Sequence, residues 1–301
     1  MAGRWRILDF STFKGELHAI RGGIEAFRED GGSAEIPVAD VAVVLVGVGV
    51  RFGAEVLHRL SAADVAVLFC DWRGIPEGAV YSWSDHGRVG ARHRAQSALS
   101  EPRKKNAWGR IVKAKVLGQA AVLRTAGIDG GGELVALAGD VRSGDPTNVE
   151  AQAARKYWSK VMGGREGRSP GAGELLGWNA CLDYGYSILR GHTVRAVLSA
   201  GLCGSLGLFH KGRGNTFALA DDLIEPFRPA IDDAVMSLPR DASPSDPDVK
   251  RNLVAAASRK FGADGLGVPA VLEDFAQQFG MYVEGDIARL EPPVWTGTVE
   301  E

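Results

Sequence analysis

Residues 111–123 read Ile-Val-Lys-Ala-Lys-Val-Leu-Gly-Gln-Ala-Ala-Val-Leu, with apolar side chains three and four positions apart. This spacing places the apolar side chains on one face of an α-helix. The second part of the chain, from about Ser97 onward, is therefore predicted to be mostly helical. The same period predicts four further helices, at residues 149–162, 175–198, 249–261 and 268–279. Two glycine-rich stretches, 126–132 and 163–173, are expected to be exposed loops.

The first part of the chain has a different pattern. Short segments rich in β-branched and aromatic residues alternate with glycine-containing turns, which is typical of strands. Strands are expected at 6–9, 16–20, 41–46, 65–69 and 79–83, with one small helix at 54–60. The sequence thus predicts an α+β protein, with a small N-terminal β-sheet domain (residues 1–88) followed by a larger all-α domain (residues 89–301).

Composition is that of a globular protein with a substantial core, because 45% of the 301 residues are hydrophobic and 24% are charged. The longest apolar run, residues 41–50, is half of what a bilayer requires, so no membrane association and a cytoplasmic location are expected. Three cysteines without paired spacing indicate neither a disulfide framework nor a zinc ribbon.

The net charge of -2 conceals a strongly basic segment. Between Arg88 and Lys115 lie nine lysines and arginines, opposed by the single acid Glu101. A local polycation of this kind is suited to the phosphate backbone of DNA. The net charge therefore does not argue against a nucleic-acid substrate.

Residues 206–229 are dense in potential metal ligands. His210 lies in a glycine-flanked loop, and Asp222 and Glu225 follow three positions apart, on one face if this turn is helical. Upstream, Glu150 lies at the edge of an apolar stripe and needs a partner for its charge. Carboxylates with one imidazole suit Mg²⁺ or Mn²⁺, with some preference for Mn²⁺.

Each of these residues also has a simpler interpretation. His210 could be a hydrogen-bonded loop histidine, and Asp222 and Glu225 could be favoured by a helix N-terminus. Asp221 competes with Asp222 for the role of an auxiliary acid, but Asp221 should be rotated about 100° away from the face that carries Glu225. Asp222 is therefore the expected auxiliary ligand.

Four segments occur together and in order, and they carry a family resemblance. They are the Gly-x-x-x-x-His loop that ends at His210, the run Leu-Ala-Asp-Asp-Leu-Ile-Glu-Pro-Phe-Arg-Pro at 219–229, the helix Asn-Val-Glu-Ala-Gln-Ala-Ala-Arg-Lys-Tyr-Trp at 148–158, and 182–190. Together they resemble the spacer-acquisition integrase and endonuclease family of CRISPR systems, the first-numbered Cas protein. The resemblance is greatest to the form that accompanies single-protein RNA-guided effectors.

The resemblance implies a β-rich dimerisation domain, a helical catalytic domain, and a metal site at Glu150, His210 and Glu225. In many relatives the third ligand is Asp rather than Glu. The implied reaction joins the 3′-hydroxyl ends of short duplex fragments to a CRISPR repeat by transesterification, and water in place of the hydroxyl gives nuclease activity. The implied partners are DNA, a second copy of the chain and a small companion adaptation protein.

The basic residues expected to contact DNA are Arg88, Arg92, Arg103, Lys104, Lys105, Lys211, Arg213 and Arg228. Two alternatives use the same resemblance differently. The chain could be a non-catalytic dimeric DNA-binding scaffold, or a metal-dependent nuclease that acts mainly on branched DNA or RNA.

Overall fold

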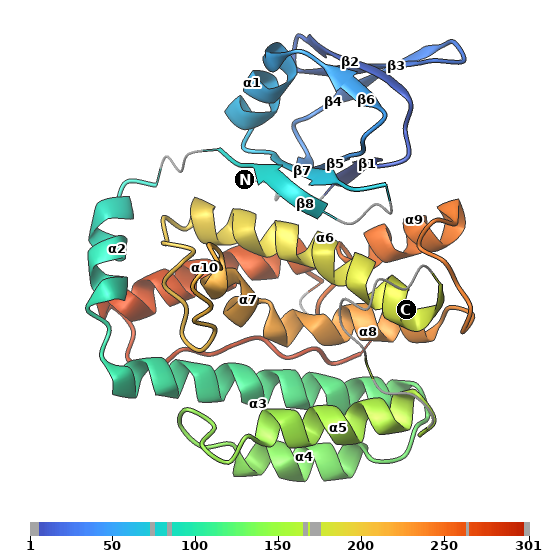
Figure 1. Cartoon of the computed structure of the whole chain (residues 1–301). Coiled ribbons are helices and arrows are strands. Elements are labelled where there is room, and N and C mark those ends of the chain that lie inside the picture. Colours follow the sequence, from blue (N-terminus) through green and yellow to red (C-terminus); the bar gives the residue numbers. More distant parts are fainter. Residues whose placement is uncertain are drawn as a thin grey trace. The chain divides into compact units, whose positions relative to one another are not determined.

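The computed structural model describes residues 6–72, 76–82, 86–164, 168, 176–262 and 265–297. The chain divides into two compact units, Met1–Ser84 and Asp85–Glu301. The first unit is built from strands and one helix, and the second is helical (Figure 1). A β-sheet region followed by a mostly helical region confirms the predicted fold class.

The first unit contains two four-stranded sheets. One has the order β1-β5-β7-β8, in which β1, β5 and β7 are parallel and β8 is antiparallel to β7. The other has the order β4-β3-β2-β6. The strands are β1 (Arg6–Phe10), β2 (Gly15–Ile20), β3 (Gly23–Arg28), β4 (Ser33–Pro37), β5 (Val41–Val46), β6 (Val50–Phe52), β7 (Ala66–Cys70) and β8 (Pro76–Val80).

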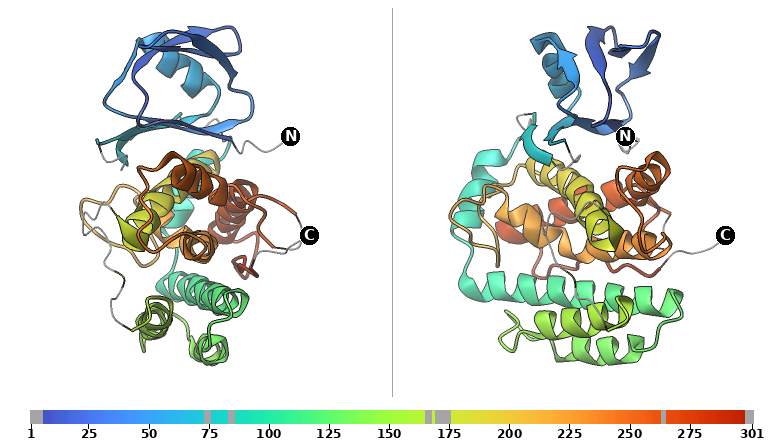
Figure 2. Two further views of the ribbon diagram at one scale, coloured as in Figure 1. Left: turned by 90° about the vertical axis from the view of Figure 1, so that its right-hand side faces the viewer. Right: turned by 45° about the vertical axis from the view of Figure 1, so that its right-hand side comes forward.

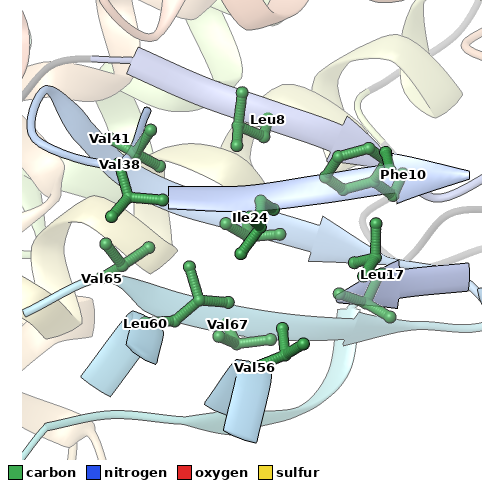
Figure 3. Packing of buried hydrophobic residues seen from close by; sticks show 13 residues of the cluster. Leu8, Phe10, Leu17, Ile24, Val38, Val41, Val56, Leu60, Val65 and Val67 are labelled. Atoms are coloured by element: carbon green, nitrogen blue, oxygen red, sulfur yellow. The ribbon is translucent and has the colours of Figure 1, made fainter. Parts of the chain in front are cut away.

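Helix α1 (Ala54–Ala62) and both sheets share one apolar core. Figure 3 shows side chains from β1, β2, β3, β5, β7 and α1 meeting in this core, and Ile24, Val41 and Val67 there are fully buried. All six residues of β5 are buried, as expected for a central strand covered on both faces. Because these strands bury apolar side chains in one core, their sequences carry the apolar pattern from which strands are predicted.

The second unit begins with α2 and a long helix, α3, which packs against α4 and α5. Figure 2 shows these last two nearly end-on in its left panel. The helices are α2 (Val89–Ser97), α3 (Glu101–Thr125), α4 (Gly131–Asp140), α5 (Val149–Val161), α6 (Gly177–Ser199), α7 (Ala218–Leu223), α8 (Arg228–Met236), α9 (Pro247–Ala256) and α10 (Val268–Glu284), with a 3₁₀ turn, η1 (Glu225–Phe227), between α7 and α8. None of the helices described is both long enough and apolar enough to cross a bilayer.

Several sequence expectations need correction in detail. Helix α3 begins at Glu101, ten positions before the predicted start, because its first turns carry mostly charged residues that show no apolar period. The expected loop 126–132 ends inside α4, which begins at Gly131. Strands β3, β4 and β6 were not predicted, and β8 ends at Val80 rather than 83. Residue 83 and most of the glycine-rich stretch 163–173 lie outside the described residues.

Two glycines in α3 allow other segments to approach the helix closely. A Cβ on Gly109 would lie 2.7 Å from the carbonyl oxygen of Arg142, and a Cβ on Gly118 would lie 2.9 Å from Pro229. Contacts this short would force the neighbouring segment away. The close approach of α3 to α8 and to the loop after α4 therefore requires glycine, which has no side chain, at positions 109 and 118.

A buried carboxyl joins three helices of the second unit. The Asp232 side chain in α8 accepts hydrogen bonds from the hydroxyl groups of Tyr157 in α5, at 3.0 Å, and of Tyr186 in α6. Burial, which outweighs the two tyrosine hydrogen bonds, raises the pKa of Asp232 from 3.8 to about 6. The folded chain therefore binds a proton at Asp232 more readily than the unfolded chain does.

We expect this carboxyl to make stability depend on pH. Because its folded pKa is raised, its contribution is complete below pH 3.8 and is lost as the pH rises through about 6. The free energy of unfolding of the protein, minus that of Asp232→Asn, should therefore fall between pH 4 and 6, by at most about 1.4 kcal/mol per pH unit. Chemical denaturation at several pH values measures it. The exposed Asp129→Asn is the control, and a pH-independent difference for Asp232→Asn contradicts the prediction.

Candidate functional site

Lysine 115 joins two of the three expected ligands. Its Nζ lies 2.6 Å from Glu150 Oε1 and 2.6 Å from Glu225 Oε2. The lysine comes from the middle of α3, Glu150 from the first turn of α5, and Glu225 from the start of η1. Two carboxylates that are 75 positions apart in the sequence therefore converge on one positive charge.

The start of α5 fixes the backbone of Glu150. Asn148, the N-cap residue, accepts a hydrogen bond from Ala151 N, and Asp145 accepts hydrogen bonds from Val149 N and Glu150 N at 2.8 and 2.9 Å. Side-chain acceptors at a helix N-terminus satisfy amides that have no partner within the helix. The carboxylate of Glu150 is thus carried on a rigid first turn.

Glu225 is almost completely buried, at 4% exposure, and it remains charged. Burial alone would raise the pKa of Glu225, but the charges of Arg228 and Lys115 outweigh burial and lower the pKa. Arg228 Nε lies 2.9 Å from Glu225 Oε1. Glu225 Oε2 makes no hydrogen bond of good geometry, so it faces Lys115 only as an ion-pair partner.

The charge of Lys115 is held in the same way. Burial opposes the ammonium form, but Glu225 and then Glu150 outweigh burial and raise the pKa of Lys115. Lys115 and Glu225 thus form a buried ion pair, and the partly exposed carboxylate of Glu150 contacts the same ammonium group. Removing Lys115 would leave the two carboxylates without their shared counter-ion, which is destabilising.

His210 is held by a different acid. Asp222, which is 0% exposed, accepts hydrogen bonds from Leu208 N at 2.5 Å, Phe209 N at 3.3 Å and His210 N at 3.2 Å. The His210 ring Nδ1 also lies 2.8 Å from Asp222 Oδ1. The hydrogen bond to Asp222, opposed by burial, raises the pKa of His210. Both oxygens of Asp222 are therefore engaged by the loop that carries the imidazole.

Aromatic rings pack against this loop. The rings of Trp108 in α3 and Phe209 lie 4.5 Å apart and parallel, and His210 meets each of them edge-on. Offset stacked and edge-to-face pairs of this kind are favourable. The imidazole is thereby fixed from two sides, and its Nε2 is the ring nitrogen not directed at Asp222.

The three expected ligands do not form a single group in this structure. Across the described part of the chain, no three His, Cys, Asp or Glu side chains lie close enough together to hold a metal ion. Glu150 and Glu225 share Lys115, whereas His210 faces Asp222. The two glutamates nevertheless fit a cation, since their oxygens already converge on one and hard divalent ions prefer oxygen ligands.

Three of the basic residues expected to contact DNA lie within the fold. Arg92 is 5% exposed and donates hydrogen bonds to Ala200 O and to the side chains of Gln277 and Glu284. Arg103 donates to the carbonyl groups of Tyr282, in the last turn of α10, and of Ile287 after it, and it lies over the ring of Tyr282. Arg228 pairs with Glu225. These three side chains are engaged by partners inside the helical unit, so the expectation that they contact DNA is not supported by their positions.

The remaining basic residues are more accessible. Arg88 is exposed and pairs with Glu284, and Lys104 pairs with Glu101. Lys105, Lys211 and Arg213 are exposed. Lys211 and Arg213 follow directly after His210 in the same loop.

Sequence reasoning counted Lys115 only as one cation of the basic segment. A signal for its role was present, because Lys115 follows Ile111 by four positions and precedes Val122 by seven, in line with the buried face of α3. A lysine on an apolar face requires a buried acid. That requirement predicts a counter-ion without identifying Glu150 and Glu225.

Comparison with known proteins agrees with this architecture. The family model for "CRISPR associated protein Cas1" matches residues 12–253. The "CRISPR-associated endonuclease Cas1" of Neisseria meningitidis serogroup C is 36% identical over 213 residues, which cover 70% of this chain and 69% of the relative.

Two solved structures share the fold across 98% of the chain. One is a Cas1 protein from Thermotoga maritima, with a TM-score of 0.75 and 17% identity over the whole of that protein. The other is a casposase bound to its integration product, with a TM-score of 0.78 and 18% identity over 95% of that protein. Because the family model covers most of the sequence and a relative above 30% identity spans two thirds of both proteins, the chain belongs to the CRISPR-associated Cas1 family.

Proposed function

We propose that this protein is a metal-dependent DNA endonuclease and integrase that joins the 3′-hydroxyl ends of short DNA fragments to a CRISPR repeat. The observation that carries the proposal is the convergence of Glu150 and Glu225 on one cationic position. The names of the relatives support it, since the Neisseria protein is called an endonuclease and the casposase was solved with an integration product.

The proposed ligands of Mg²⁺ or Mn²⁺ are Glu150, Glu225 and His210. When bound, the ion would polarise the scissile phosphate and offset charge on the attacking and leaving oxygens. Lys115 now neutralises both glutamates, so a divalent ion would have to replace its ammonium as their counter-ion. His210 would contribute Nε2, because Asp222 engages Nδ1.

Asp222 is proposed as a positioning residue instead of the auxiliary ligand expected from its spacing. It is fully buried, it accepts hydrogen bonds from three backbone amides of the loop, and it also contacts the imidazole. A carboxylate behind a ligating histidine fixes the orientation of the ring and raises its basicity. Asp222 would thus direct His210 toward the glutamates.

The reaction exchanges one phosphodiester bond for another. The oxygen of the fragment's 3′-hydroxyl attacks a phosphorus atom at the border of a repeat, its proton passes to solvent, and the bond from that phosphorus to the old 3′ oxygen breaks. The departing 3′ oxygen takes up a proton from solvent, so that strand leaves with a 3′-hydroxyl. Water as the attacking group would give hydrolysis instead. Lys211 and Arg213, which are exposed and follow His210 in the same loop, would neutralise nearby phosphates.

The proposed partners are duplex DNA, a second copy of the chain and the companion protein Cas2. A solved chain from an assembly named a Cas6-RT-Cas1–Cas2 complex shares the fold over 36% of its own length, with a TM-score of 0.75 and 18% identity. Another, with a TM-score of 0.55 and 19% identity, comes from a Cas1–DNA complex. The N-terminal unit is the proposed dimerisation domain. The proposed site of action is the cytoplasm, where the repeat DNA would be.

Glu150→Gln should abolish strand joining while DNA binding persists. The amide keeps the shape of the side chain but removes a charge from the cation position, so joining of a labelled fragment to a repeat-containing duplex should fall about 100-fold or more. The dissociation constant for DNA should change by less than about threefold, because Glu150 is not a phosphate contact. The exposed Glu133→Gln, which lies on the neighbouring helix α4, is the control. Unchanged joining by Glu150→Gln would refute the ligand assignment.

Asp222→Asn should disturb both the loop and the imidazole. Its amide group would face backbone donors, so the free energy of unfolding should fall by about 2 kcal/mol, and joining should decrease because His210 loses its orientation. Because His210 would be less well oriented, the apparent affinity for Mn²⁺ should also decrease. The metal dependence of the melting temperature measures this affinity. Asp221→Asn, one position away and paired with Arg190, is the matched control. Equal effects of the two substitutions on Mn²⁺ affinity would contradict the positioning role.

Lys115→Met should strengthen the response to divalent ions. Without the ammonium, the two glutamates lack their shared counter-ion, so the metal-free variant should be less stable and Mn²⁺ should raise its melting temperature more than it raises that of the unmodified protein. Lys113→Met, an exposed lysine two positions earlier, serves as the control. A Mn²⁺ response no larger than that of the unmodified protein would show that Lys115 does not compete with the ion.

A further inference from the structure

A second concentration of positive charge lies in a pocket on α3. The pocket has a volume of about 380 Å³ and is formed by α3, the loop after α4 and the segment after α10. Four cationic side chains line it, with Glu291 as the acid. They are Arg110 and Lys113 from α3, Arg142 from the loop and Arg289 from the C-terminal segment.

The backbone is shaped to form this pocket. Gly109 in α3 lies where the carbonyl oxygen of Arg142 comes within 2.7 Å of a potential Cβ, so the loop after α4 can approach the helix. That approach brings Arg142 beside Arg110 and Lys113 although about thirty positions separate them in the sequence. The cluster is therefore a product of the fold and not of one basic run.

The cations of the pocket have few acidic partners. Arg289 lies 3.8 Å from Glu291, and Arg110 donates to the amide oxygen of Asn106 at 3.1 Å. Within the described ranges, no acid forms an ion pair with Lys113 or Arg142, both of which are exposed. Burial lowers the pKa of Arg110, and the positive charge of Arg289 nearby lowers it further.

The pocket faces away from the candidate metal site. At about 100° per residue, Lys113 and Arg110 lie roughly 140–160° around the axis of α3 from Lys115. The body of the helix, about 10 Å across, therefore separates the pocket from the glutamates. A group held in the pocket cannot be the phosphate that reacts at Glu150 and Glu225.

We propose that this pocket, lined by Arg110, Lys113, Arg142 and Arg289, binds a backbone phosphate of DNA at a point remote from the reacting phosphodiester. Guanidinium groups recognise phosphate oxygens by paired hydrogen bonds, and three of them with one lysine provide several donors in one hollow. An integrase must hold both an incoming fragment and a target duplex, so a contact away from the reacting bond has a use. The proposal rests on the proposed function for that use only.

The test compares affinity with chemistry in Arg142→Gln and Lys113→Gln. Both side chains are exposed, so neither substitution should unfold the protein. Binding to a fluorescently labelled duplex, measured without divalent metal over a range of NaCl concentrations, should weaken roughly threefold or more. The slope of the logarithm of affinity against the logarithm of salt should fall by about 1, as for one lost phosphate contact. The joining rate at saturating DNA should stay unchanged.

Arg251→Gln is the matched control, because it removes one exposed arginine on α9 and changes the net charge equally. Unaltered binding and salt slope in the pocket variants would overturn the proposal, and so would losses equal to that of Arg251→Gln. A reduced joining rate at saturating DNA would also overturn it, since the pocket would then act on the reacting bond. Binding is measured without metal, so a failure of Glu150→Gln to abolish joining would refute the catalytic proposal alone.

Discussion

The ammonium group of Lys115 between the carboxylates of Glu150 and Glu225 is the interaction on which the helical unit's candidate site depends. It links α3, the start of α5 and η1. Burial would raise the pKa of Glu225, but the charges of Arg228 and Lys115 outweigh burial and lower it. Buried ion pairs contribute little net stability compared with apolar contacts of the same volume. Two carboxylates that converge on one cationic position are what the proposed metal site requires.

The residues around this ion pair hold Glu225 and the loop of His210 in place. Arg228 supplies a second positive charge to Glu225 and lies over the ring of Tyr186, whose hydroxyl contacts Asp232. Asp222 gathers the loop of His210, and Trp108 of α3 supports that loop through Phe209. Helix α3 thus contributes to the glutamate pair and to the imidazole loop. A site assembled on a long helix is held more precisely than one assembled on loops.

Much of the fold was readable from the sequence, and the reasons are specific. The buried strand β5 is a short continuous run of apolar, mostly β-branched residues, and the helix α5 has apolar residues at helical spacing, so the sequence predicts the type of each. Strand β4 lies at the edge of its sheet and is mostly exposed, which gives it little apolar signal. Strand β3 lies inside the sheet, but it has only six residues and carries Glu25 and Arg28 among its apolar ones. Arg92 and Arg103 were expected to contact DNA because charge alone does not reveal which side chains find buried acceptors. Contacts of that kind, like the pairing of Lys115, depend on segments that only the fold brings together.

The two glycines of α3 have a consequence for how the helical unit forms. Each glycine in a helix interior costs about 1 kcal/mol of helix propensity relative to alanine, and α3 has them at positions 109 and 118. As an isolated segment, α3 would consequently be a weak helix despite its 25 residues. Its neighbours press against both glycines and provide the stability that the backbone lacks. The unit is thus expected to fold as one cooperative body, in which the longest helix becomes stable only when its partners have docked.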